Sequence, residues 1–268
     1  MLLPIIDFQT EINPQKPTLI LLHGVFGRGK NFGQIGRAFS KKIQCLAFDL
    51  RNHGQAHSGP LDMQAMAEDV IETCLHLKLE NIILLGHSMG GKIAMSAALE
   101  KSRHQAEWKQ IFKALIVADV APVAFSLPYQ QMAVKLARLE FPALLTRKSA
   151  SDFILEKVSE AENAMISMWL AQNLVPGNFP YWENNMAQIA LDFENLTQWP
   201  AGKSLSTFHK PTLFLRGGKS NHLTPSSEAV ISRLFPNFLI ETIEESGHWL
   251  HAEQPEAFVR LVEKFLEI

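Results

Sequence analysis

The sequence has 268 residues, of which 47 % are hydrophobic and 19 % are charged, and its formal net charge is −2. These values are ordinary for a folded globular protein and exclude a disordered chain. The small net charge gives no electrostatic reason to expect nucleic acid as a partner. No apolar run approaches the roughly 20 residues that a membrane span requires.

The N-terminal residues 1–6 are apolar, but Asp7 interrupts the run and no basic residue precedes it. We therefore expect no secretory signal peptide. The two cysteines, Cys45 and Cys74, lie far apart in apolar runs and are predicted to be free thiols of the core rather than a disulfide or a metal site. Together these features favour a cytoplasmic protein.

Short apolar runs alternate with longer segments of helical period along the chain. The helical segments include 63–79 and the terminal 256–266. The runs are almost wholly apolar, as expected of strands that helices cover on both faces. The pattern predicts an α/β protein with a mostly parallel, doubly wound sheet. The predicted strands are 18–23, 43–48, 81–86, 113–119, 212–216 and 238–243.

The alternation breaks between residues 126 and 207, where no convincing strand is found. A structureless loop of that length is uncommon in a compact domain, so we predict a helical cap inserted before the penultimate strand. Residues 1–125 and 208–268 then form the core. The expected cap helices are 132–145, 152–158 and 164–174, and four aromatic residues are expected to pack in the interior rather than contact a ligand: Trp169, Phe179, Tyr181 and Trp182.

The strongest functional signal is the sequence Gly86-His87-Ser88-Met89-Gly90. An apolar strand precedes it and a small-residue helix pattern follows, which is the context of a nucleophile elbow. The sharp turn would lift the Ser88 hydroxyl above the sheet, at the positive end of a helix. We therefore predict Ser88 as the nucleophile.

A serine hydroxyl needs a neighbouring base, which is usually histidine. Of the ten histidines, His248 lies in a glycine-containing loop after the last predicted strand. Loops after parallel strands gather at one edge of the sheet, so this loop is placed to meet Ser88. His248 is the predicted base.

The acid of the triad usually follows the penultimate strand, but residues 216–225 contain no carboxylate. One strand earlier, Asp119 ends the predicted strand 113–119 at the same edge. Asp119 is therefore the predicted acid, and Ser220 could give a supporting hydrogen bond. If neither carries the role, Ser88 and His248 would work as a dyad.

An oxyanion hole needs backbone N–H groups that face the developing charge. One should come from Met89, the residue after the nucleophile, and the other from the loop 23–27. We choose Val25 for the second donor. Phe26 is the adjacent alternative, although its ring could instead line the pocket.

Phe26, His222 and Trp249 are the candidate substrate-binding residues. Arg51 and His53 could bind a polar part of the substrate, and a structural role is at least as plausible. The sequence contains no zinc-binding, clustered Cys/His or phosphate-loop motif. We therefore expect no metal and no cofactor.

These motifs together make the chain similar to the α/β-hydrolase superfamily, and within it to the YbfF-type bacterial esterases and their mitochondrial relatives. The matching stretches are His23–Gly27, Arg51–Gly54, Gly86–Lys92, Asp119–Pro122 and Gly247–Trp249. The resemblance implies hydrolysis of acyl esters or thioesters without a cofactor. From the predicted nucleophile and base we expect the reaction to pass through an acyl-enzyme and to act on small acyl groups. It also implies an acid after the strand that precedes the cap, which supports Asp119.

The same residues would serve a C–C bond hydrolase or a cofactor-free perhydrolase, and a hydrolase-like module could have lost catalysis and only bind. The expected partner is a small-molecule ester or thioester. Acyl chain length, the choice between ester and thioester, and the oligomeric state do not follow from the sequence.

Overall fold

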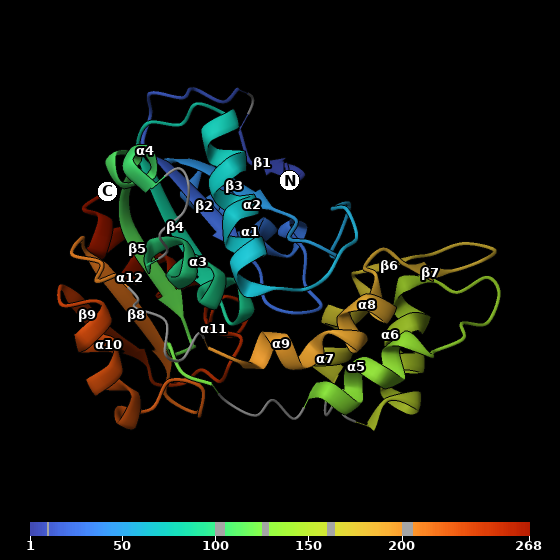
Figure 1. The fold of residues 1–268 in the computed structure, drawn as a ribbon. Helices are drawn as coiled ribbons and strands as arrows, with labels where there is room; N and C mark the ends of the chain where they lie inside the picture. The colour runs from blue at the N-terminus through green and yellow to red at the C-terminus, as the bar shows by residue number, and fades with distance from the viewer. Residues whose placement is uncertain (10, 100–104, 125–128, 160–163, 200–205) are drawn as a thin grey trace.

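The fold is built on a seven-stranded sheet, shown in a computed structural model that describes every residue except 10, 100–104, 125–128, 160–163 and 200–205 (Figure 1). The strand order is β1-β3-β2-β4-β5-β8-β9. The strands are β1 (Ile5–Asp7), β2 (Thr18–Leu22), β3 (Gln44–Phe48), β4 (Ile82–His87), β5 (Phe112–Ala118), β8 (Thr212–Gly217) and β9 (Phe238–Ile243).

All neighbouring strands pair in parallel except β1, which runs antiparallel to β3. The α/β-hydrolase fold with a mostly parallel, doubly wound sheet is thus confirmed. Each of the six predicted strands is present, with ends within a residue or two of those expected. The three-residue strand β1 was not predicted.

The strands are apolar because both faces of the sheet are covered. In β2, Leu19 and Leu21 join one hydrophobic cluster, whereas Ile20 and Leu22 join the other. The first cluster includes residues of α1 (Gly33–Phe39), α11 (Leu250–Glu253) and α12 (Pro255–Leu266). The second includes residues of α2 (Met63–His76), α3 (Met89–Leu99), α4 (Gln105–Ile111) and α10 (Glu228–Leu234). Two short 3₁₀ helices, η1 (Gly29–Phe32) and η3 (Pro225–Ser227), lie in the loops after β2 and β8.

The elements between β5 and β8 form a group at one side of the sheet, and α9 is the helix of this group that lies nearest the strands (Figure 1). We refer to them as the 129–197 segment. They are α5 (Tyr129–Ala137), α6 (Arg147–Lys157), α7 (Ala164–Ala171), β6 (Leu174–Val175), β7 (Tyr181–Trp182), α8 (Met186–Leu191) and α9 (Phe193–Thr197). The predicted boundary at residue 126 lies outside the described residues.

Three details of the prediction for this segment are wrong. The helix expected over 132–145 ends at Ala137, and Pro142 prevents any continuation through that stretch. The helix expected over 164–174 ends at Ala171, and Leu174 begins a strand. The segment is also not free of strands, because β6 and β7 form a small antiparallel pair.

Both cysteines are buried free thiols, Cys45 in β3 and Cys74 in α2. Burial raises the pKa of each thiol above its ordinary value. Among the described residues, no helix combines the length and the apolar character that crossing a membrane would require.

Candidate active site

Ser88 lies in a tight turn between β4, which ends at His87, and α3, which begins at Met89. Its backbone is left-handed, with φ of 53°, which is strained for a residue with a side chain. A Cβ atom on Gly86 would overlap the carbonyl of Gly90, and one on Gly90 would overlap the carbonyl of Leu22. The two glycines therefore let strand and helix approach closely enough to form the elbow.

His248 approaches Ser88 from the loop between β9 and α11. Its Nε2 lies 3.0 Å from Ser88 Oγ, and its backbone carbonyl accepts a hydrogen bond of 2.8 Å from His87 Nε2. The ring is buried, and burial lowers the pKa of His248 well below its ordinary value, with further lowering by His222 and His251. A neutral imidazole in this position can take the proton of the Ser88 hydroxyl.

Asp119 follows the last residue of β5 and holds the opposite side of the His248 ring. Asp119 Oδ2 accepts a hydrogen bond of 2.7 Å from His248 Nδ1, and Oδ1 accepts one of 3.0 Å from the Gly217 amide. The Ser220 hydroxyl also donates to Oδ2. Burial raises the pKa of Asp119 to about 6, although the hydrogen bonds from Ser220 and Gly217 act in the opposite direction. Asp119 is thus the carboxylate against His248, and Ser220 supports that carboxylate.

The loop 23–27 lies directly beside the elbow. A Cβ atom added to Gly24 would be 3.4 Å from Ser88 Cβ, so the loop backbone faces the nucleophile. The amide of Phe26 already donates to His53 Nε2 at 3.1 Å. This bond makes Phe26 a poor choice as oxyanion donor and favours Val25, alongside Met89 at the start of α3.

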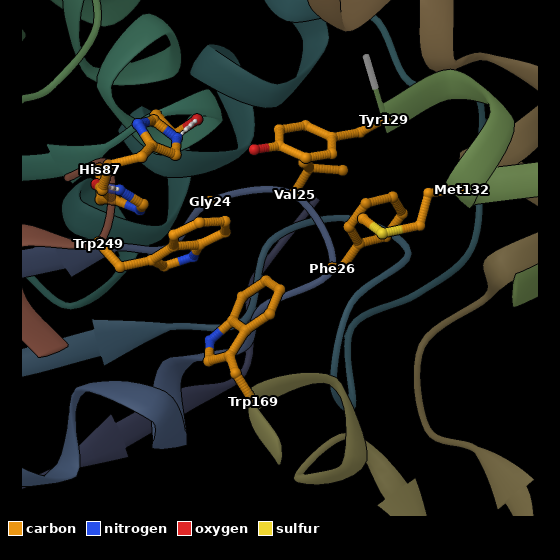
Figure 2. A pocket seen from close by; sticks show the side chains of 10 residues that line it. Gly24, Val25, Phe26, His87, Tyr129, Met132, Trp169 and Trp249 are labelled. Atoms are coloured by element: carbon orange, nitrogen blue, oxygen red, sulfur yellow. Dashed lines mark hydrogen bonds between the residues drawn. The ribbon is translucent and has the colours of Figure 1, made fainter. Parts of the chain in front are cut away.

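A narrow pocket with a free volume of about 20 Å³ lies in front of Ser88. In Figure 2 the rings of Tyr129, Trp169 and Trp249 stand around this space, with Phe26 on the side opposite Trp249. Its lining residues come from the core and from the 129–197 segment, and none carries a permanent charge: Gly24, Val25, Phe26, His87, Ser88, Tyr129, Met132, Trp169, His248 and Trp249. Such a surface suits an uncharged apolar group.

The sequence located part of this pocket. Phe26 and Trp249 line it as predicted, but His222 does not; its ring stacks on that of His248, with centroids 3.8 Å apart. Trp169 was expected in the interior and instead faces the pocket. Tyr129 and Met132 were not predicted, since only the docking of α5 brings them to Ser88.

The other aromatic residues of the segment behave differently from one another. Trp182 is partly buried and donates to the carbonyl of Leu136, at 2.9 Å. Phe179 is 89 % exposed and Tyr181 is 58 % exposed, so the expectation that both pack in the interior is wrong.

Arg51 and His53 are both absent from the pocket lining. Arg51 pairs with Asp69 at 2.8 Å, and His53 is buried against the 23–27 loop. Both residues are therefore held by protein contacts, away from the position of a substrate.

Asp119, His222 and His248 offer potential metal-binding atoms within 4.8 Å of one another. The two imidazoles are stacked almost face to face, with 21° between their planes. Ring nitrogens of stacked imidazoles point side by side rather than converging on one point. The arrangement therefore suits a hydrogen-bonded triad better than a metal centre.

Comparisons with known proteins agree with this geometry. A model of the alpha/beta hydrolase family matches residues 19–261. The sn-1-specific diacylglycerol lipase ABHD11 of Mus musculus is 32 % identical, covering 93 % of this chain and 81 % of its own length. Esterase YbfF of Escherichia coli is 26 % identical over 92 % of each chain.

A solved structure described as a marine microorganism esterase superposes with a TM-score of 0.85 and 30 % identity, covering 98 % of this chain and 99 % of its own. The family model and these relatives span nearly the whole sequence. The chain belongs to the alpha/beta hydrolase family.

Proposed function

We propose that the protein is a serine hydrolase that cleaves carboxylic esters of small, uncharged acyl groups. The observation that carries the proposal is the position of His248, within hydrogen-bond distance of Ser88 Oγ on one side and Asp119 on the other. The apolar pocket in front of Ser88 and the esterase and lipase names of the relatives support the substrate class.

In the proposed reaction, Ser88 Oγ attacks the ester carbonyl carbon while His248 Nε2 takes the hydroxyl proton. The amides of Val25 and Met89 stabilise the resulting oxyanion. His248 returns the proton to the departing alcohol, the C–O bond breaks, and the acyl group remains on Ser88. Water, deprotonated by His248, then releases the acid and restores the serine.

The 129–197 segment supplies Tyr129, Met132 and Trp169 to the pocket. We infer that residues 126–207 act as a cap that shapes the acyl site on a core of residues 1–125 and 208–268. The cytoplasmic location expected from the sequence stays a prediction.

The decisive experiment labels the purified protein with a fluorophosphonate probe and measures hydrolysis of p-nitrophenyl esters of graded chain length. We expect both labelling and hydrolysis, and the loss of both in Ser88→Ala. Labelling that is unchanged in Ser88→Ala would refute the proposal.

The same panel separates the other possibilities. Faster turnover of thioesters or of carbon–carbon cleavage substrates would redirect the assignment to those reactions. A protein that neither reacts with the probe nor turns over any substrate would be a binding module.

A further inference from the structure

Phe26 has a backbone conformation that its own residue type disfavours. Its φ is 65°, in the left-handed region that bulky side chains seldom adopt. Such strain persists only where surrounding contacts fix the backbone. Val25 and Phe26 are the two central residues of a turn that is closed by a hydrogen bond of 3.0 Å from the Gly27 amide to the Gly24 carbonyl. That carbonyl shares a peptide plane with the Val25 amide, so the contacts that hold Phe26 also constrain the direction of the Val25 amide.

The first contact that fixes Phe26 comes from the core. Its N–H donates to His53 Nε2 at 3.1 Å, while His53 Nδ1 donates to the carbonyl of Arg51 at 2.8 Å. Burial lowers the pKa of His53 to about 3, so its ring stays neutral and Nε2 stays an acceptor at neutral pH. His53 belongs to the Arg51–Gly54 motif, which has no place in the catalytic steps above.

The opposite side of the same residue is held by the 129–197 segment. The Phe26 carbonyl accepts hydrogen bonds from Asn173 Nδ2 at 2.6 Å and from Asn184 Nδ2 at 2.8 Å. Asn184 Oδ1 accepts from the Gly54 amide at 2.7 Å, which ties the same asparagine to the His53 motif. Both asparagine side chains are almost completely buried.

The orientation of the Asn173 side chain leaves one of its polar atoms without a hydrogen bond in the described part of the chain. Its Oδ1 is buried without a hydrogen-bond partner among the described residues, whereas its Nδ2 reaches Phe26. An unpaired buried acceptor is unfavourable and calls for an explanation. The explanation is that this orientation lets Asn173 Nδ2 donate to the Phe26 carbonyl.

We propose that His53, Asn173 and Asn184 are positioning residues that hold the 23–27 loop with its Val25 amide directed at the oxyanion. Because two of the three come from the 129–197 segment, the hole is complete only when that segment is docked on the core. The proposal rests on the function proposed above and assigns the segment a part in catalysis besides shaping the pocket.

The test removes the two amide donors. Asn173→Asp and Asn184→Asp keep the side-chain shape and replace the amide nitrogen by an oxygen that repels the Phe26 carbonyl. Asn195→Asp is the control for the same change at an exposed asparagine, because Asn195 Nδ2 also joins the segment to a core carbonyl, that of Leu61 at 3.1 Å, and neither residue lines the pocket.

We expect kcat/KM for p-nitrophenyl butyrate to fall by about 100-fold in each test variant, because a misplaced catalytic group costs on this order. KM should change little. The inhibition constant of a trifluoromethyl ketone, whose adduct carries an oxyanion, should rise in parallel with the loss of kcat/KM. Asn195→Asp should match the parent in both measurements.

Further measurements keep the proposal testable if the aspartate variants fold poorly. Asn173→Ala and Asn184→Ala should show the same kcat loss and faster hydrogen exchange in residues 23–27. In the parent protein, nitrogen NMR should find the His53 proton on Nδ1 and the Phe26 amide slow to exchange. Unchanged kcat in the alanine variants, or a fast-exchanging Phe26 amide in the parent, would overturn the proposal.

Failure of the positioning proposal can be distinguished from failure of the proposed esterase function. If Ser88→Ala kept esterase activity, the proposed function would fail. The NMR and hydrogen-exchange measurements would still show whether His53 and the two asparagines hold the 23–27 loop. If Ser88→Ala were inactive and the asparagine variants were fully active, only the positioning role would fail.

Discussion

Asp119 has a left-handed backbone with φ of 52°, at the point where β5 gives way to the loop that follows. Its amide donates to the carbonyl of Leu215 at 2.8 Å, so the neighbouring strand fixes this conformation. The carboxylate reaches the His248 ring as a result. The proposed acid therefore lies one strand earlier than the usual position.

Asp119→Asn tests this assignment. The amide keeps the shape of the side chain but allows the wrong tautomer of His248, so we expect kcat/KM for p-nitrophenyl butyrate to fall roughly 10⁴-fold. Circular dichroism should show an unchanged fold. Activity equal to that of the parent would mean that the acid is misassigned.

The pH dependence follows from the environment of His248. Burial lowers its pKa well below the ordinary value, with His222 and His251 as the next causes. The base works only when it is neutral, and Asp119, with a pKa of about 6, supports it only when ionised, so activity is lost as the pH falls through these two pKa values. We expect kcat/KM to be level between pH 7 and 8, with the midpoint of the acid limb below 6.5. A midpoint at pH 7 or above would contradict the expectation.

Among the elements, α3 and α9 are joined by a buried lysine. Lys92 Nζ donates to the carbonyls of Thr197 at 2.8 Å and Gln198 at 3.1 Å, at the end of α9. Burial lowers the pKa of Lys92 to about 7. The folded protein therefore holds this proton less tightly than the unfolded chain does.

This difference has a defined sign. Between pH 7 and the ordinary lysine pKa, the unfolded chain binds more protons at this position, so the free energy of unfolding rises with pH. We expect the difference between the parent and Lys92→Met to grow by about 1 kcal/mol per pH unit from pH 7.5 to 9, in the parent's favour. Urea unfolding at several pH values measures it. Parallel profiles for the two proteins would show that Lys92 keeps an ordinary pKa.

An element could be predicted when its own residues carry the pattern, and could not when it depends on pairing with a distant strand. The strand over 82–87 is marked by its own apolar run and by the elbow that follows, so the sequence suffices. β1 has three half-buried residues and exists through its pairing with β3, which no local pattern reveals. The two-residue strands β6 and β7 likewise exist only through their pairing with each other.

The site divides in the same way. Ser88, His248 and Asp119 follow strands of one parallel sheet, and the rule that the carboxyl ends of such strands share an edge is enough to predict that the three residues meet. Tyr129 and Trp169 reach the pocket only because the 129–197 segment docks on the core. Their helical spacing fits an interior position equally well, so periodicity alone could not decide.

At the scale of the whole molecule, Arg28 joins the core to the 129–197 segment. Its guanidinium donates to the carbonyl of Gln172 at 2.6 Å and pairs with Glu183, and the side chain is only 10 % exposed. Removing one partner of a buried ion pair leaves the other charge without compensation.

Arg28→Ala should therefore lower the free energy of unfolding by about 3 kcal/mol. The melting temperature should fall by about 6 °C or more. Lys264→Ala is the control: its pair with Glu241 is mostly exposed and should be worth less than about 1 kcal/mol. Calorimetry of the three proteins decides, and equal melting temperatures would mean that Arg28 does not hold the parts together.

Because the thiols of Cys45 in β3 and Cys74 in α2 are buried, the native protein has no reactive cysteine among its own residues. Iodoacetamide should leave its mass unchanged at neutral pH, because neither sulfur is accessible or ionised. A single cysteine introduced at Tyr129, a half-buried residue of the pocket wall, would then carry a fluorophore there and nowhere else. The emission of that dye would report directly when the acyl site fills and empties.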